Sequence, residues 1–312
     1  MSRIKIEADH QYQKRKRLSD LYFKGVFRLT GLISALFIVI IFVFILNKGV
    51  RVFLPNYEHG QINLFDFLTG NTWRQDVAVY GIGFIIVNTL IASLGAILIS
   101  FPISILTALF IVKIAPRRIS VLMITIVELL AAIPSVVYGV FASGIIVPIV
   151  NDIGQSLGHR TFGGNSLLAV VLLLAIMTFP TICSLSISAI KAVPSQLEEG
   201  SLALGASKTQ TNFKIVLTAA KSGIFAGLIL GLGRAFGEAT AVSMVAGNKM
   251  WGPTTDLFDT TRTLTSTMLA GLKETTGLDY DIRFSVGIVL MLIILITNYI
   301  INKIKKNIGN LY

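Results

Sequence analysis

The stretch Gln196–Thr218, QLEEGSLALGASKTQTNFKIVLT, is a polar insert between two apolar runs that are each long enough to cross a bilayer. Glu198 and Glu199 follow Pro194 closely, so they fall in the first turn of a predicted helix, where the helix dipole favours negative charge. Gly205 predicts the end of that helix, because glycine tolerates left-handed backbone angles. A short helix held between two membrane spans can transmit a push from a soluble partner. An ordinary connecting helix is the alternative interpretation.

Apolar runs of similar length recur along the whole chain. Of the 312 residues, 54% are hydrophobic and only 14% are charged, a composition that excludes an ordinary soluble domain. We therefore expect an all-α, polytopic membrane protein with six transmembrane helices. The expected spans are Leu29–Asn47, a helix within Val77–Val112, Ile119–Asn151, Ser166–Ile190, Ser222–Gly247 and Phe284–Asn302.

The second of these runs is too long for one upright helix. Val77–Val112 is free of charge for 36 residues, and a helix of that length would measure about 54 Å against a hydrocarbon core of about 30 Å. Part of it is therefore expected to lie outside the bilayer, to tilt, or to break near Pro102. Glu128 and Pro134 interrupt the third span, and Pro180 predicts a kink in the fourth.

Lys and Arg residues are distributed unequally between the two sides of the expected bundle. About eighteen of the 27 lie in the two tails and alternate loops together with five acidic residues, whereas eight lie in the other loops with nine acidic residues. The first side therefore carries a charge of about +13 and the second about −1, which is the positive-inside pattern. This pattern explains the net charge of +11 without a nucleic-acid partner and predicts that both termini are cytoplasmic.

Several other classes of function lack a signal. Cys183 is the only cysteine, so an internal disulfide is excluded, and His10, His59 and His159 do not have metal-ligand spacing. We expect neither a metal nor another cofactor. The basic N-terminal tail precedes a long apolar segment without a cleavage signal, so that segment is expected to be a retained span. The tail is interpreted as a topology anchor, and contact with anionic membrane lipid is the alternative.

The fifth span contains glycines at regular spacing. Gly223, Gly227 and Gly231 recur every four residues, and Gly233 and Gly237 do the same on another face. Small residues at this spacing let helices approach closely in lipid, so helix packing is the expected role. The glycines also leave room beside two charged residues of the same span.

Those two residues are Arg234 and Glu238, one turn apart near the middle of the expected fifth span. Each costs about 2.5–3.5 kcal/mol to insert into a membrane, so both are expected to face a water-filled cavity or the bundle interior. Glu128 in the third span is a candidate third member of this charged cluster. An arginine would be a barrier to a cation, so the cluster favours an anionic substrate. A structural ion pair within the bundle is the alternative.

Two motifs resemble known families. The spacing of Glu199, Gly205, Ile215 and Leu217 resembles the EAA loop through which permeases of ATP-driven importers contact their ATPase, although Gly200-Ser201 replace the usual alanines and Thr218 the usual proline. GLGRAFGEATAVSMVAGN at 231–248 and ELLAAIPSVVYGV at 128–140 closely resemble the PstC family, the permease subunits of phosphate-specific ABC importers. The first motif fits PstC better than the sister PstA family, and the resemblance extends from about residue 76 to 302.

The resemblance implies the type I ABC importer permease fold. It divides the chain into a basic cytoplasmic tail at 1–28, a first transmembrane helix and external segment at 29–76, a core permease domain at 77–302, and a second cytoplasmic tail at 303–312. The core contains a cytoplasmic coupling loop at 191–221. The resemblance assigns Glu198, Glu199, Gly205, Ile215 and Leu217 to ATPase coupling, and Arg234, Glu238 and Glu128 to the substrate path.

The resemblance also implies partners: a PstA-like second permease, a PstB-like cytoplasmic ATPase dimer and a PstS-like external phosphate-binding protein. The chain carries no Walker A sequence. Its nearest approach runs from Gly200 to Gly205, and the residue directly after this second glycine is Ala206, where the motif requires lysine. It is therefore expected to be a transport subunit without a nucleotide-binding site or catalytic residues. A permease for another oxyanion, such as molybdate or sulfate, is the nearer alternative. A channel or transporter driven by an ion gradient is the more distant one.

Overall fold

The computed structural model of the chain describes the backbone of residues 2–309 and the side chains of Lys16 and of residues 20–306. Five long helices dominate it: α1 (Ser2–Arg51), α3 (Gly83–Leu109), α7 (Leu167–Lys191), α10 (Leu217–Gly237) and α13 (Leu278–Gly309). Shorter α-helices connect them: α2 (Leu64–Thr69), α4 (Arg117–Ala132), α5 (Ser135–Phe141), α6 (Val147–Ser156), α8 (Ser195–Ala203), α9 (Lys208–Gln210), α11 (Thr240–Val245) and α12 (Leu264–Leu269). The remaining elements are the π-helical turns η1 (Phe110–Ile114), η2 (Ala142–Ile146) and η3 (Thr211–Val216) and the antiparallel strands β1 (Trp73–Arg74) and β2 (Val79–Tyr80).

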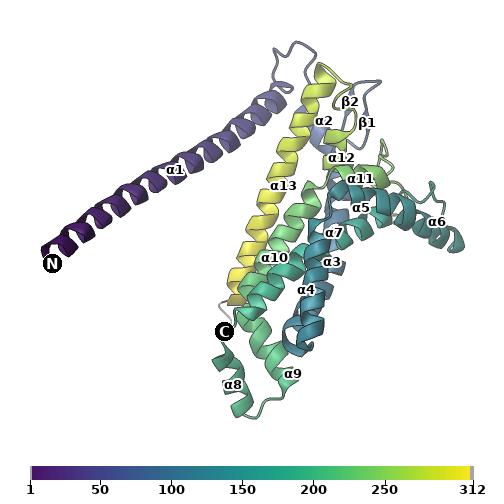
Figure 1. Cartoon of the computed structure of the whole chain (residues 1–312). Coiled ribbons are helices and arrows are strands. Elements are labelled where there is room, and N and C mark those ends of the chain that lie inside the picture. The colour runs from purple at the N-terminus through teal and green to yellow at the C-terminus, as the bar shows by residue number, and fades with distance from the viewer. Residues whose placement is uncertain (1, 310–312) are drawn as a thin grey trace.

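Six helical segments within the described residues are long and apolar enough to cross a membrane, as predicted. They are Asp20–Arg51, Gly83–Ile114, Ser135–Ser156, Leu167–Lys191, Lys208–Gly237 and Leu278–Lys306. The C-terminal part of α13 lies toward the end of the bundle where α8 lies, whereas α1 runs away from the bundle to the left (Figure 1). The basic side chains of the first fifteen residues lie outside the described ones.

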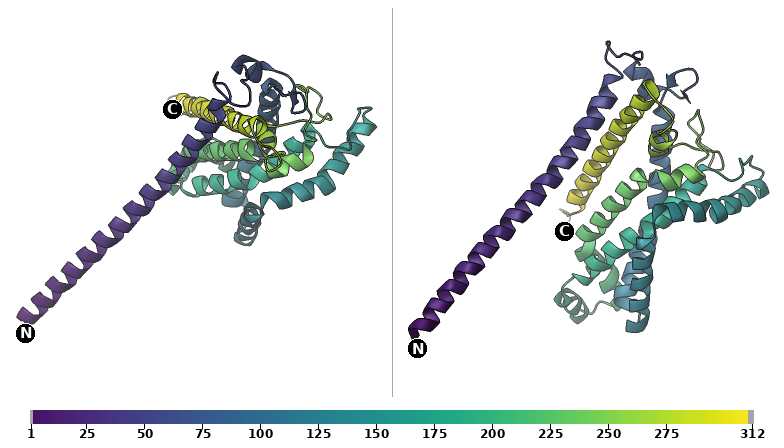
Figure 2. Two further views of the ribbon diagram at one scale, coloured as in Figure 1. Left: turned by 90° about the horizontal axis from the view of Figure 1, so that it is seen from above. Right: turned by 45° about the horizontal axis from the view of Figure 1, so that its top comes forward.

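The third apolar segment, predicted as a single span at 119–151 interrupted by Glu128 and Pro134, is divided into separate helices. Helix α4 ends at Ala132, Ile133 and Pro134 are extended, and α5 begins at Ser135. Proline disfavours a helical conformation in the residue before it, which explains the break at Ile133. Beyond it, α5 and α6 turn away from the direction of α4 and lead out to the side of the bundle (Figures 1 and 2).

The long charge-free run at 77–112 is not helical over its first six residues, which shortens the helix that follows. Residues 77–82 form β2 and a turn, and α3 begins only at Gly83. The helix then continues through Pro102, so the break considered there does not occur. Helix α7 likewise continues through Pro180.

Helix α7 forms the centre of the bundle. It packs against both α3 and α10. Of the most apolar 18-residue stretch of α7, 67% is buried, whereas none of the corresponding stretch of α1 is buried. Helix α1 contacts α13 at one end, where Ser285 Oγ donates to the backbone oxygen of Gly49 at 2.7 Å. Its other end points away from the rest of the molecule (Figures 1 and 2).

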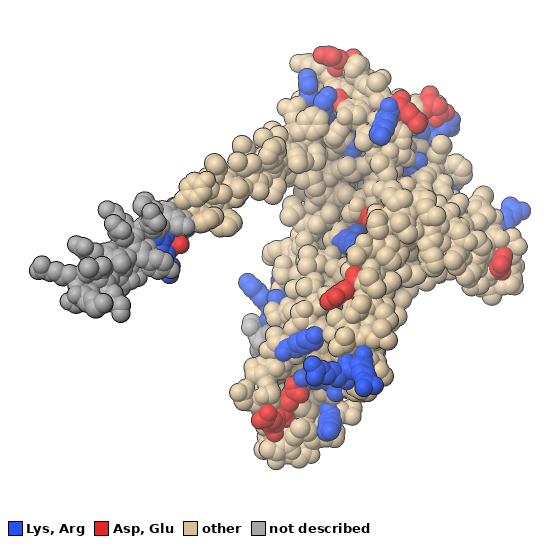
Figure 3. Space-filling view, viewed as in Figure 1, with Lys and Arg blue, Asp and Glu red and all other residues tan. Residues whose placement is uncertain are grey.

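The two ends of the bundle differ in structure and in charge. At the end opposite α8, α2, the β1–β2 pair, α12 and their loops form a folded polar layer. Figure 3 shows charged side chains at both ends of the molecule and a largely uncharged surface between them. In the polar layer, the carboxylate of Asp256 accepts from the backbone N–H of Phe258 at 2.9 Å and pairs with His159 at 3.1 Å. These contacts lower the pKa of Asp256.

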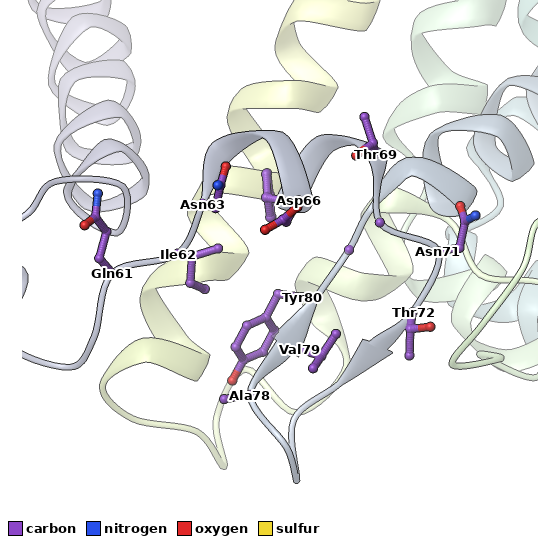
Figure 4. A pocket seen from close by; sticks show the side chains of 13 residues that line it. Gln61, Ile62, Asn63, Asp66, Thr69, Asn71, Thr72, Ala78, Val79 and Tyr80 are labelled. Atoms are coloured by element: carbon purple, nitrogen blue, oxygen red, sulfur yellow. The ribbon is translucent and has the colours of Figure 1, made fainter.

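The cavity drawn in Figure 4 belongs to this polar layer. Its volume is about 470 Å³, and it lies between α2 and the β1–β2 pair. Asp66 is the charged residue among its lining side chains, so the cavity does not attract anions electrostatically. It is separate in sequence and structure from the residues predicted to form a substrate path.

Candidate functional site

The predicted coupling loop folds as two short helices that lie beyond the end of the bundle (Figure 1). Helix α8 carries Glu198 in its first turn, as expected. It ends before Gly205, whose φ of +86° confirms the predicted role of this glycine as the terminator. Ile215 lies half-buried in η3, and Leu217 is the first residue of α10. Helix α8 packs on η3, where the hydroxyls of Ser201 and Thr211 are 2.9 Å apart.

The apolar side chains of α8 are not covered by the rest of the chain. Leu197, Leu202 and Leu204 are 46%, 42% and 91% exposed. Helix α8 has no buried residue. An apolar surface this exposed on a short helix is typical of a protein contact site.

The two glutamates of α8 have different surroundings. Glu198 forms an ion pair with Lys113 of η1, and both side chains are mostly shielded from solvent, at 23% and 17% exposure. Glu199 is exposed. Because η1 continues α3, the Lys113–Glu198 pair connects the coupling loop directly to a helix of the bundle. Sequence reasoning did not find this pair, whose members are 85 residues apart.

The glycines of α10 divide into two faces. An added Cβ would lie 2.5 Å from Ala189 at Gly223, 3.3 Å from Leu185 at Gly227 and 2.7 Å from Ile182 at Gly231, all on α7. Gly233 and Gly237 have nothing within 4 Å of that position. The first three glycines therefore pack α10 on α7, as predicted, and the other two face open space next to Arg234.

Arg234 lies in the last turn of α10 and is partly buried. Its Nη1 donates to Thr181 Oγ1 of α7 at 3.0 Å. Among the described residues, no carboxylate lies within ion-pair distance of Arg234. The alternative of a structural Arg234–Glu238 pair is therefore not supported by this structure.

The expectation that Glu238 lies one helical turn beyond Arg234 is wrong, and so is the continuous span at 222–247. Helix α10 ends at Gly237, Glu238 is extended, and the chain continues as the separate helix α11. Glu238 Oε1 accepts from the backbone N–H of Ala241 at 3.1 Å and so caps the start of α11. Its backbone oxygen accepts from Thr265 Oγ1 at 2.8 Å. The chain changes direction at Glu238, whose φ of −74° and ψ of 114° are extended.

Glu128 does not join the predicted cluster. Its side chain is exposed on α4 and makes no ion pair with Arg234 in the described part of the chain. The structure therefore brings together Arg234 and Thr181, with Glu238 in the adjacent helix break.

The helix break borders a cavity of about 330 Å³. Gly237 and Ala239, on either side of Glu238, form one wall, and Thr265, Met268 and Arg283 contribute to another. The cavity is largely apolar apart from Thr265 and Arg283. Neither of these two residues was singled out from the sequence. The run 260–267, TTRTLTST, is rich in hydroxyl side chains and contains Arg262, and this pattern could have drawn attention to Thr265. No group of residues that could hold a metal ion occurs in residues 20–306.

Six membrane-length helices, an exposed helix pair beyond one end and a charged helix break beside a cavity define a multi-pass membrane permease. The chain belongs to the family described as "Binding-protein-dependent transport system inner membrane component", whose sequence pattern matches residues 100–308. The chain is thus a permease subunit of a transport system and not its nucleotide-binding subunit. This membership confirms the predicted location in the inner membrane.

Three relatives align with most of the chain. The chain is 33% identical over 301 residues to the "Probable ABC transporter permease protein YqgH" of Bacillus subtilis, covering 94% of each chain. It is 33% identical over 289 residues to the "Phosphate transport system permease protein PstC" of Pasteurella multocida, covering 86% of this chain and 90% of that one. It is 32% identical to the probable PstC protein of Methanocaldococcus jannaschii, over 86% of this chain and 89% of the relative. The resemblance noted in the sequence is confirmed.

A solved structure supports the fold. A chain of a bacterial ABC transporter involved in the import of the acidic polysaccharide alginate superposes with a TM-score of 0.60, at 21% identity, over 93% of this chain and 99% of that one. The predicted ABC importer permease fold is confirmed.

Proposed function

We propose that this chain is the permease subunit of an ATP-driven importer that moves inorganic phosphate into the cell by alternating access. The observation that carries the proposal is its similarity over most of its length to permeases named for phosphate transport. Arg234 adds chemical support, because it is a cation beside open space and without a carboxylate partner among the described residues. Such a group stabilises a passing anion electrostatically.

In this proposal the anion passes the break between α10 and α11. Arg234 contributes the positive charge, and Thr181 holds its guanidinium in place. Glu238 fixes the geometry of the break by capping α11, so its role is to position the path and not to pair with Arg234. Glu128, exposed on α4, would reach the substrate only in another arrangement of the spans.

The energy for transport comes from a separate ATPase dimer that docks on the coupling loop. The exposed leucines of α8 provide an apolar contact surface, and the Lys113–Glu198 pair carries a displacement of α8 into α3. The basic residues near this end of the bundle support a cytoplasmic position for it and for both termini (Figure 3). The remaining proposed partners are a second permease subunit and an external phosphate-binding protein, with the membrane lipid around them.

The test is ATP-dependent phosphate uptake by the complete complex reconstituted in liposomes, with and without this chain. We expect phosphate uptake to require the chain, ATP and the external binding protein. Excess sulfate or molybdate should not inhibit this uptake. Uptake of sulfate or molybdate in place of phosphate would assign the chain to another oxyanion. Uptake that follows the membrane potential without ATP would contradict the importer mechanism itself.

A further inference from the structure

A second arginine without a carboxylate partner lies in the polar layer at the end of the molecule opposite α8. Arg262 is only 7% exposed. Its Nε and Nη1 are buried and have no hydrogen-bond partner. No carboxylate lies within ion-pair distance of it in the described part of the chain. A buried guanidinium is normally paired or fully hydrogen-bonded, so its environment lacks an anion.

The backbone on both sides of Arg262 is held by hydrogen bonds. The backbone N–H of Thr261 donates to the oxygen of Ala246 at 2.7 Å. Thr263 caps α12 through the backbone N–H of Ser266 at 3.2 Å. The backbone N–H of Leu264 donates to Thr89 Oγ1 of α3 at 3.0 Å.

A second buried cation lies close to the first. Arg283 is 2% exposed, and its Nε and Nη1 donate to the backbone oxygens of Asp279 and Thr267 at 3.0 and 2.6 Å. Burial, together with the positive charge of Arg283, lowers the pKa of Arg262 to about 10. Arg262 therefore remains charged at neutral pH, and two cations share one region of the polar layer.

The carboxylates nearby have other partners. Asp279 accepts from the hydroxyl of Tyr80. Asp281 pairs with Lys48 at 3.2 Å and also accepts from a tyrosine hydroxyl. Asp259 pairs with Lys249. The positive charge of Arg262 is thus not neutralised by these acidic residues.

Two other unsatisfied groups in this region can donate, while Asn248 Oδ1, next to the Gly247–Thr261 bridge, is a buried acceptor without a partner. Thr261 Oγ1 is buried and has no partner. Asn88 Nδ2 is buried without a partner as well, while Oδ1 of the same side chain accepts from the backbone N–H of Thr254 at 3.3 Å. The spare donors together with the positive charge suit an anion that offers several oxygens.

This region is connected to the helix break described above. Thr265, three residues after Arg262, donates to the backbone oxygen of Glu238. Thr265 and Arg283 also line the cavity that borders Gly237 and Ala239. Arg262 is thus linked to the helix break through Thr265, and its neighbour Arg283 lines the cavity at that break.

We propose that Arg262, supported by Arg283, forms a second oxyanion site, which receives the transported anion before it reaches Arg234. The inference rests on the proposed function for the identity of that anion, inorganic phosphate. A carboxylate supplied by a partner protein is the competing occupant, and the experiment below separates the two.

The experiment uses the complete reconstituted importer with Arg262→Met, Arg262→Lys and, as the matched control, Arg160→Met at an exposed arginine of the same end. We expect Arg262→Met to slow ATP-dependent phosphate uptake at least about tenfold, because a buried charge contact is lost, and Arg262→Lys to retain most of it. Arg160→Met should transport normally. Uptake by Arg262→Met within about twofold of the unmodified complex, at equal protein level, would overturn the proposal.

A stability measurement distinguishes substrate binding from a structural role. Because Arg262 is buried without a partner, Arg262→Met should leave the thermal midpoint of the complex unchanged or raise it. Inorganic phosphate should raise the midpoint of the unmodified complex, measured without the external binding protein, and have no such effect on Arg262→Met. An equal rise in both would overturn the proposal. If Arg262→Met does not assemble, Arg262→Gln is held to the same criteria.

The remaining outcomes are also decisive. Loss of co-purification of the binding protein or the second permease with Arg262→Met would show that a partner's carboxylate occupies the site, which contradicts the proposal. If the unmodified complex imports sulfate and not phosphate, the proposed function fails. The oxyanion site would then still be supported by slower sulfate uptake in Arg262→Met. Normal phosphate uptake in that variant would disprove the site alone.

Discussion

Replacing Gly223 by alanine tests the face of α10 that packs on α7, and hence the face that is left to line the path. The new Cβ would lie 2.5 Å from the Cβ of Ala189, whereas an optimal carbon–carbon contact is about 3.5–4.0 Å. Since Ala189 has no longer side chain that can move aside, the two helices must separate by about 1 Å. Overpacking of this kind costs about 1–3 kcal/mol, and the better helix propensity of alanine returns up to about 1 kcal/mol.

The matched control is Gly233→Ala on another face of the same helix, where nothing lies within 4 Å of the new Cβ. That variant should be neutral or more stable by up to about 1 kcal/mol. The two variants should therefore differ by about 2 kcal/mol in the free energy of unfolding, with Gly223→Ala the less stable. Unfolding of the purified chain in mixed detergent micelles measures the difference. Equal stabilities, or the reverse order, would refute the assignment of the two faces.

Three further predictions concern the coupling loop and the polar layer. Glu198→Gln removes the partly shielded pair with Lys113, so it should cost about 1 kcal/mol and reduce about fivefold the ATPase stimulation produced by loaded binding protein. Gly205→Leu places a branched side chain at φ +86°, which costs about 1–2 kcal/mol, and should release the ATPase in pull-down while the chain still inserts. Asp256 has a lowered pKa, so the contacts that hold its carboxylate stabilise the fold above its ordinary pKa. The difference in thermal midpoint between the unmodified chain and Asp256→Asn should shrink as the pH falls through the lowered pKa.

Each of these three has its own control. The double variant Lys113→Glu, Glu198→Lys restores opposite charges and should recover part of the stimulation, and failure of the single variant to reduce it would argue against coupling through this pair. Gly205→Asn tolerates the left-handed conformation and should keep more ATPase bound than Gly205→Leu. Unchanged co-purification with Gly205→Leu would count against docking at this loop. A midpoint difference that does not vary with pH would show that the Asp256 carboxylate does not contribute.

The six spans were predictable because a bilayer imposes a length and an apolar composition that can be read directly from the sequence. The termination of α8 at Gly205 and the packing glycines of α10 were predictable for a similar reason, since glycine has few other roles at those spacings. Span length, apolar composition and glycine spacing can be read from one segment alone, because they do not depend on which helices pack together.

The helix break after Gly237 was not predicted, because apolar residues continue on both sides of it and suggested one span. That error placed Glu238 on the same face as Arg234, whereas the break turns its carboxylate to the start of α11. The Lys113–Glu198 pair and the burial of Arg262 depend on contacts between distant segments. Periodicity and composition carry no record of such contacts.

The central claim is that the positive charge at Arg234 stabilises an anion on its way through the permease. The most direct measurement is ATP-dependent phosphate uptake by the reconstituted complex carrying Arg234→Gln, with Arg234→Lys as the charge-preserving control. Two unit charges about 4 Å apart interact by about 4 kcal/mol at an effective dielectric constant of about 20. Halving this for partial exposure leaves about 2 kcal/mol, or about 30-fold in rate. Uptake about 30-fold slower in Arg234→Gln, with normal assembly and substantial activity in Arg234→Lys, is the predicted result. Near-normal uptake by Arg234→Gln in an intact complex would contradict it.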